Sequence, residues 1–238
     1  MTPAEREQIM NMEFSIAMSA HPSPEPEAVP PPLSRLSEGL EEVCAAGARD
    51  MAAALAFTLG RAAAGQGRGV VMSATRAWLG ENGRPYGPGL AGFQARDGFV
   101  LVETRTEALA LWAMEQALRS GGAAMVIGTV DGAELAQTRR LEFAARDGGC
   151  SGLLLRARSG DLSAARRRWN ITTLASAGDA FDDRAPGRMT IRAEMTRSRM
   201  ERPGVWMLEQ DDETYRLRLA DRLAGDGLGE RGRTGLAA

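Results

Sequence analysis

Short apolar runs alternate with longer segments of helical spacing along the middle of the chain. The strand-like runs are 41–45, 69–74, 98–103, 123–130 and 152–156, and the helical segments are 49–63, 105–120 and 133–147. The run AAMVIGTV at 123–130 has few polar residues, which is typical of a strand buried on both faces of a parallel sheet. Strands that alternate with helices of this length predict a doubly wound α/β domain.

Segment 105–120 shows the clearest helix boundaries. Thr106 is suited to cap its first turn, and Gly121 follows its last turn. Its spacing predicts apolar contacts to the core from Leu109, Trp112, Met114, Ala117 and Leu118.

The last third of the chain has a different pattern. Segments 169–174, 189–195 and 203–209 are strand-like and are separated by turns, so we expect an antiparallel extension of the sheet. Residues 211–238 are rich in Gly, Arg and Asp, which predicts a flexible tail with room for a short helix at 214–223.

The first 32 residues form a region of their own. Residues 4–18 place Ile9, Met12, Ile16 and Met18 at roughly helical spacing, and residues 22–32 contain six prolines, typical of a stiff linker. Two interpretations remain open: the helix packs on another subunit or on a partner, or residues 1–32 are a frayed tail. The expected organisation is therefore 1–32, a core over 33–210, and the tail 211–238.

The composition excludes several chemistries. All 29 basic residues are arginine, and the formal net charge is −2. Without lysine there is no Schiff base and no lysine to hold nucleotide phosphates, although a coding bias towards Arg explains the absence. His21, Cys44 and Cys150 lie too far apart for a metal site, and one histidine makes a Ser-His-Asp triad unfavourable. With no membrane span or signal peptide in the sequence, we expect a cytoplasmic protein without cofactor or membrane partner.

In an α/β domain of this layout a phosphate-binding loop would lie between strand 41–45 and helix 49–63, where the chain reads CAAGARDMAAAL. Gly47 is the single glycine there, Arg49 replaces the lysine, and Asp50 repels phosphate at the start of the helix. Strand 123–130 also lacks the metal-binding aspartate at its end, since Asp131 with Glu134 is better suited to cap the next helix. The sequence therefore predicts a degenerate loop.

Two segments are candidates for binding. Segment 83–90 (GRPYGPGL) predicts an ordered turn-rich loop, or a recognition loop through Arg84 and Tyr86. Segment 138–168 holds eight arginines against three acids, which suits DNA phosphates, an acidic partner, or an ordinary solvated surface. The residues considered for DNA or partner binding are Arg139, Arg140, Arg156, Arg158, Arg166, Arg167, Arg168 and Trp169.

Five segments in order resemble the ImuA-type proteins of bacterial mutagenesis cassettes. They are GRPYGPGLAGF (83–93), EALALWAMEQALRS (107–120), MVIGTV (125–130), 138–156 and 188–213. The resemblance covers roughly residues 33–213 and rests on the ordered set rather than on one motif.

This resemblance implies a RecA-like core and a role in damage-induced, error-prone translesion synthesis. The implied partners are the polymerase-like protein ImuB, RecA in some cases, and an error-prone replicative-type polymerase. Partner binding through C-terminal segments points to residues 188–238, with Arg197, Arg199, Arg202 and Trp206 as candidate contacts. Two alternatives are a degenerate RecA-type, DNA-stimulated ATPase that uses Arg49, and a cell-division inhibitor resembling SulA.

Overall fold

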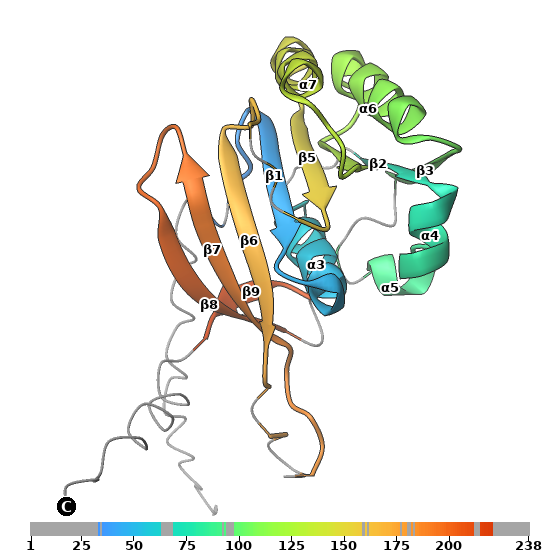
Figure 1. Ribbon diagram of the computed structural model, residues 1–238. Coiled ribbons are helices and arrows are strands. Elements are labelled where there is room, and N and C mark those ends of the chain that lie inside the picture. The colour runs from blue at the N-terminus through green and yellow to red at the C-terminus, as the bar shows by residue number, and fades with distance from the viewer. Residues whose placement is uncertain are drawn as a thin grey trace, which may run out of the picture.

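The computed structural model describes residues 33–220, apart from 34, 63–68, 92, 94–97, 159, 161, 177, 180–181, 183 and 212–214. Its centre is a nine-stranded sheet in the order β3-β2-β4-β5-β1-β6-β7-β8-β9 (Figure 1). Strands β1 to β6 pair in parallel, whereas β7, β8 and β9 are each antiparallel to the strand before them. The predicted α/β class and the antiparallel C-terminal extension are thus confirmed.

The parallel part of the sheet follows the predicted elements closely. Its strands are β1 (Gly39–Ala45), β2 (Val70–Thr75), β3 (Phe99–Thr104), β4 (Met125–Thr129), β5 (Ser151–Arg156) and β6 (Arg167–Leu174). The predicted helices correspond to α3 (Met51–Ala62), α6 (Glu107–Ser120) and α7 (Leu135–Asp147). The extension consists of β7 (Thr190–Ser198), β8 (Gly204–Gln210) and β9 (Leu217–Leu219).

Helices cover both faces of the sheet. Phe57 of α3 packs in one apolar cluster with alternate strand residues such as Val43 and Ile127. Met114 of α6 and Leu141 of α7 pack in a second cluster on the opposite face. Successive strand residues therefore supply opposite cores, which explains why the central runs are apolar throughout.

Three local elements differ from the sequence prediction. Helices α4 (Arg76–Asn82) and α5 (Gly87–Ala91) lie between β2 and β3, where no helix was predicted and 83–90 was assigned to a loop. The Thr75 hydroxyl accepts from the Trp78 N–H at 3.1 Å and so caps α4. The helix prediction at 214–223 was wrong for its described part, because β9 pairs there with β8 and joins residues 217–219 to the sheet.

Helix α6 has the predicted ends but a different buried face. The Thr106 hydroxyl accepts from Leu109 N–H at 3.3 Å, and Gly121 adopts the left-handed conformation at the C-cap. Leu109 and Trp112, however, are about half exposed instead of lying in the core. The α6 stripe that meets the sheet is formed by Ala110, Met114 and Leu118, because those positions lie one helical turn apart.

A loop rather than a helix connects β5 to β6. Its residues 163–165 are buried as they reach the start of β6, and Ala165 is fully buried. Arg197 donates to the carbonyls of Ser163 and Ala165, both at 2.7 Å, and Arg199 donates to the carbonyl of Ala164 at 3.0 Å. The two arginines thereby satisfy carbonyls that an irregular buried segment would otherwise leave without partners.

The C-terminal strands belong to the core. Ile191, Ala193 and Leu208 are fully buried in the same cluster as α3. The predicted N-terminal helix and proline linker (1–32) and the tail beyond residue 220 lie outside the described residues. In the described part of the chain, helices fall short of the length and apolarity that a membrane crossing requires.

Candidate functional site

The loop after β1 is where an α/β sheet of this kind would bind a nucleotide. A short 3-10 helix (Ala48–Asp50) joins β1 to α3. The Ala46 N–H donates to the Ile171 carbonyl of β6, and the Asp50 N–H donates to the Gly47 carbonyl, both at 2.9 Å. Gly47 has an extended backbone, with φ −154°. Two N–H donors of this loop are therefore used internally.

Asp50 is part of the structure of this loop. Its side chain is buried, and its Oδ1 accepts from the Thr173 N–H of β6 at 2.9 Å. The carboxylate thus joins the start of α3 to the neighbouring strand and places negative charge where a phosphate would approach. Arg49 is exposed beside it.

The end of β4 is also occupied by internal contacts. Asp131 follows the strand, and its Oδ1 accepts from the Ala157 N–H at 2.5 Å while its carbonyl accepts from Arg156. The predicted cap of the following helix, Asp131 with Glu134, is therefore confirmed only for Glu134. Glu134 is the N-cap residue of α7, and its N–H donates to the Gln137 side chain at 2.8 Å.

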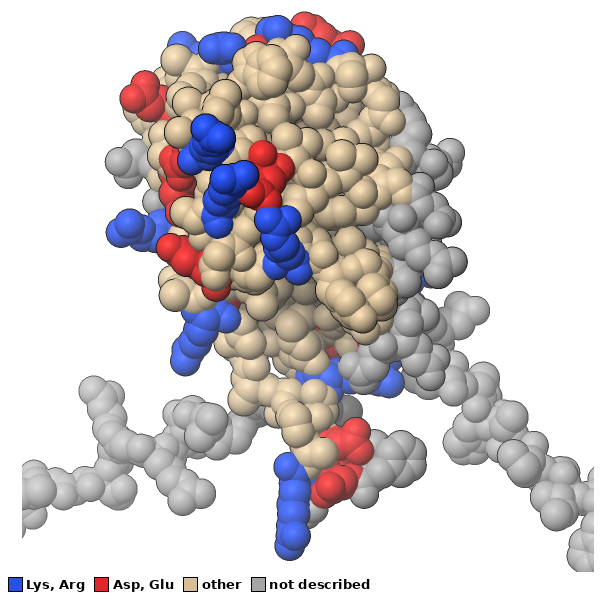
Figure 2. Space-filling view, turned by 90° about the vertical axis from the view of Figure 1, so that its right-hand side faces the viewer, with Lys and Arg blue, Asp and Glu red and all other residues tan. Residues whose placement is uncertain are grey.

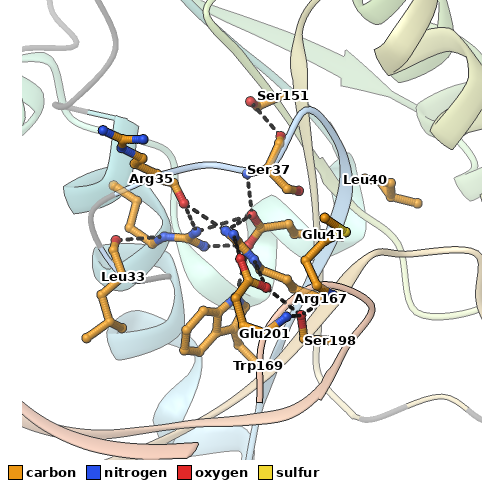
Figure 3. A network of polar contacts seen from close by, with 12 residues as sticks. Leu33, Arg35, Ser37, Leu40, Glu41, Ser151, Arg167, Trp169, Ser198 and Glu201 are labelled. Carbon is orange, nitrogen blue, oxygen red and sulfur yellow. Dashed lines mark hydrogen bonds and ion pairs between the residues drawn. The ribbon is translucent and has the colours of Figure 1, made fainter. Parts of the chain in front are cut away.

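The most extensive polar cluster of the core surrounds Glu41 in β1 (Figure 3). Arg61 of α3 donates to Glu41 Oε2 at 2.7 Å, and Arg167 of β6 donates to Oε1 at 3.1 Å. The Trp169 indole N–H adds a bond of 2.9 Å to Oε2, and the Ser37 N–H adds one of 2.6 Å to Oε1. All four donors converge on one carboxylate inside the sheet, which makes Glu41 a junction between α3, β1 and β6.

Neighbouring groups set the charge state of Glu41. Burial by itself raises the pKa, but the charge and hydrogen bonds of Arg61, helped by Arg167 and Ser37, outweigh burial and hold the pKa of Glu41 at about 2. The Arg61 guanidinium also lies 5.4 Å from the ring centre of Phe57 and 5.2 Å from that of Trp169. Cation–π contacts and ion pairing therefore hold the Arg61 guanidinium in place.

A second ion cluster lies around the next residue, Glu42. Arg156 of β5 donates to its Oε1 at 2.9 Å, and Arg168 of β6 donates to its Oε2 at 2.7 Å. Glu42 is fully buried, and both arginine side chains are at most 10% exposed. The two glutamates of β1 thus face opposite sides of the sheet, and each is neutralised by arginines from neighbouring elements.

These clusters correct the prediction of a basic binding surface over 138–168. Arg156, Arg167, Arg168 and Trp169 are buried, so their side chains bind the core instead of DNA or a partner. Arg166 pairs with Glu142 at 2.7 Å and is partly exposed. The predicted residues that do reach the surface are Arg139, Arg140 and Arg158.

The predicted recognition loop at 83–90 is partly exposed. Tyr86 is 73% exposed, and Arg84 pairs with Glu103 at the end of β3. Arg76 donates to the same carboxylate at 2.5 Å, and these two arginines lower the pKa of Glu103. The loop is therefore fixed to the edge of the sheet, with Tyr86 directed to solvent.

The predicted partner contacts in the C-terminal strands have different environments. Arg197 and the exposed Arg199 donate hydrogen bonds to carbonyls of the β5–β6 loop. Arg202 is exposed near the β7–β8 turn. Trp206 is partly buried and packs 5.7 Å from Trp169, measured between ring centres.

The outward residues of β8 are instead Val205 and Met207, which are 47% and 45% exposed. Sequence reasoning missed them, although the alternation with the inward Trp206 and Leu208 is a readable period-2 signal.

A groove between α6 and α7 was also missed. It has a volume of about 270 Å³, and its apolar lining comes from Leu111, Trp112 and Leu141. Figure 2 looks onto the side that carries α4 and α6 and shows basic and acidic side chains along the top and left of a broad uncharged surface. The exposed Trp112 and Leu109, which periodicity assigned to the core, mark this face as unpartnered within the described chain.

No protein-family model matches this chain. A crystal structure of SulA from Pseudomonas aeruginosa aligns with a TM-score of 0.38 at 22% identity, covering 50% of this chain and 98% of SulA.

Two curated proteins, both named Protein ImuA and from two strains of Caulobacter vibrioides, are 31% identical to this chain over 168 residues. The match covers 62% of this chain and 66% of each relative, so it spans just under two thirds of their length. On this similarity, the chain belongs to the ImuA family.

Proposed function

We propose that this chain is an adaptor of damage-induced, error-prone translesion DNA synthesis that hydrolyses no nucleotide. Its membership of the ImuA family supports the pathway. In this proposal a RecA-like core with a degenerate phosphate-binding loop serves as a scaffold. An ImuB-type polymerase-like protein is the principal partner, and RecA and an error-prone replicative-type polymerase are further partners.

The observation that carries the proposal is the position of Asp50. Asp50 lies at the start of α3, and its buried carboxylate accepts a hydrogen bond from the Thr173 N–H of β6. A nucleotide phosphate at this place would need positive potential and open N–H donors. A phosphate placed there would meet a like charge, and Asp50 could rotate away only by losing its bond to β6. The loop therefore disfavours ATP.

The open face of the β7–β8 hairpin supports partner binding. Val205 and Met207 project from β8 on the face opposite to Trp206 and Leu208. Two exposed apolar residues on one strand favour association with another protein. They lie in the part of the chain, residues 188–238, that the family resemblance connects with ImuB.

The binding test uses point variants, because deleting residues 188–238 would remove buried strands of the core. The full chain is captured on the ImuB-type protein of the same organism, with Val205→Asp and Met207→Asp introduced together. We expect at least a tenfold loss of affinity, whereas Val100→Asp on the exposed edge strand β3 serves as the matched control and keeps binding. Retained binding by the β8 variant would show that this face is not the partner site.

The catalytic test measures ATP hydrolysis by the full chain with and without single-stranded DNA. We expect no turnover above background and no effect of Arg49→Ala. DNA-stimulated hydrolysis that disappears in Arg49→Ala would replace the adaptor proposal with an ATPase. Direct DNA binding is tested separately with Arg139→Ala, Arg140→Ala and Arg158→Ala, because the buried Arg167 and Arg168 cannot be removed without disturbing the core.

A further inference from the structure

The groove between α6 and α7 combines apolar walls with polar groups on its floor. Leu111 and Trp112 of α6 face Leu141 of α7 across it. The Glu115 carboxylate lies at its base and is held by Arg140 at 2.6 Å and by Arg119 at 2.8 Å. Trp112 is 57% exposed, a large apolar area for a surface position.

The rim of this groove is basic. Arg140 of α7 lines it and Arg119 of α6 lies beside it; both are exposed and pair with Glu115. The exposed carboxylates of these two helices are Glu107 at the start of α6 and Asp147 at the end of α7. The groove is therefore suited to an occupant with large apolar side chains and flanking carboxylates.

One segment of this chain has that chemistry. Residues 4–18 carry Ile9, Met12 and Ile16 at the spacing of one helical face, and Glu13 lies beside that stripe. The segment contains three glutamates (5, 7 and 13) and one arginine, so its side chains carry a net charge of −2. An amphipathic helix that places its apolar face in a hydrophobic groove is a common mode of recognition.

The intervening chain is long enough for this contact. Residues 19–32 at about 3.1 Å per residue span about 43 Å in an extended proline-rich conformation. The linker joins the core at Leu33, whose carbonyl accepts from Arg61, and the start of β1 that follows contacts α7, since the Leu40 N–H donates to Glu142 at 2.6 Å. Tethering through a linker of this length gives an effective concentration that approaches the millimolar range, so even weak docking would fill the groove.

We infer that residues 4–18 bind intramolecularly in the α6–α7 groove, with Ile9, Met12 and Ile16 against Trp112 and Leu141. Their glutamates then lie near the arginines of the rim. This contact covers the unpartnered face of α6 and makes the groove unavailable to other proteins. The inference stands on the groove and on the sequence of the segment, and is independent of the adaptor proposal.

Amide hydrogen exchange of the full chain tests this inference. We expect the amides of residues 4–18 to exchange at least ten times more slowly in the natural protein than in the double variant Trp112→Gln, Arg140→Gln. The variant Ile9→Ser, Met12→Ser should release the segment to the same degree. The matched control is Phe143→Gln, Arg146→Gln, which alters an exposed aromatic and an exposed arginine of α7 that do not line the groove.

The outcomes separate the alternatives. Equal exchange in the natural protein and in the groove variant would overturn the inference, as would equal loss of protection in the control variant. Protection that grows over a hundredfold range of protein concentration would identify a second copy as the source of the segment and would refute intramolecular docking. Constant protection over that range, lost only in the groove and segment variants, supports it.

Discussion

Replacing Glu41 by Gln tests whether the buried ion cluster stabilises the fold. On folding, the pKa of the Glu41 carboxylate falls from its ordinary value of 4.5 to about 2. Each pKa unit corresponds to about 1.4 kcal/mol, so the charged form gains about 3 kcal/mol from its surroundings. Removal of one partner from a buried ion pair costs about 3–5 kcal/mol, because the other charges stay buried. Both routes predict that Glu41→Gln lowers the free energy of unfolding by about 3 kcal/mol at pH 7.

The pH dependence gives a sharper test. Because the folded pKa is depressed, this stabilisation is complete above pH 4.5 and is lost as the pH falls towards 2. Urea unfolding followed by circular dichroism should give a difference between the natural protein and Glu41→Gln of about 3 kcal/mol at pH 7. By linkage this difference shrinks to about 1 kcal/mol at pH 3.

A control keeps this measurement specific. Glu194 pairs with Arg192 on the open face of β7, and both side chains are about one third exposed. Glu194→Gln should change the free energy of unfolding by less than about 1 kcal/mol. A difference for Glu41→Gln that is equally small, or that does not change with pH, would refute the assigned role of the cluster.

Three further predictions concern local features. Both cysteines should resist a thiol reagent in the native protein at pH 8 and react after unfolding, because both are buried and burial raises the pKa of Cys44 to about 11. In urea unfolding, Thr106→Ala should cost about 1 kcal/mol by loss of the helix cap, whereas Thr106→Ser should be nearly neutral; equal effects would contradict the capping role. Gly148→Ala should lower the melting temperature strongly, because its Cβ would lie 1.9 Å from the Leu118 carbonyl oxygen, while Gly122→Ala should leave it unchanged.

The arginines show how composition and structure give different information. Coding bias accounts for 29 arginines without lysine, but many of these positions use geometry that lysine lacks. Arg61 donates to Glu41 and to the carbonyls of Leu33 and Arg35 from one planar group. Lysine has a compact ammonium group and could not bridge these separate acceptors in the same way. The arginine-rich sequence was therefore a poor guide to the surface and an unrecognised sign of buried ion pairs.

The sequence by itself determined most of the helices and strands, apart from α4, α5 and β9, because hydrophobic periodicity and helix caps are local properties. The alternation of strands and helices, the caps of α6 and the strand pattern of the C-terminal third were all predicted from it. The sequence also showed that the loop after β1 carries Asp50 and lacks the lysine and the hydroxyl side chain of a phosphate-binding loop. Residue identity alone is enough for that conclusion.

Only the tertiary structure decided which charged residues are buried, because burial depends on strands far apart in sequence. Glu41 and Arg167 are 126 residues apart, and they meet because β6 pairs with β1. The same pairing carries Trp169 from a predicted surface into the core. Side-chain environment follows from the order of the strands in the sheet, which no local pattern specifies.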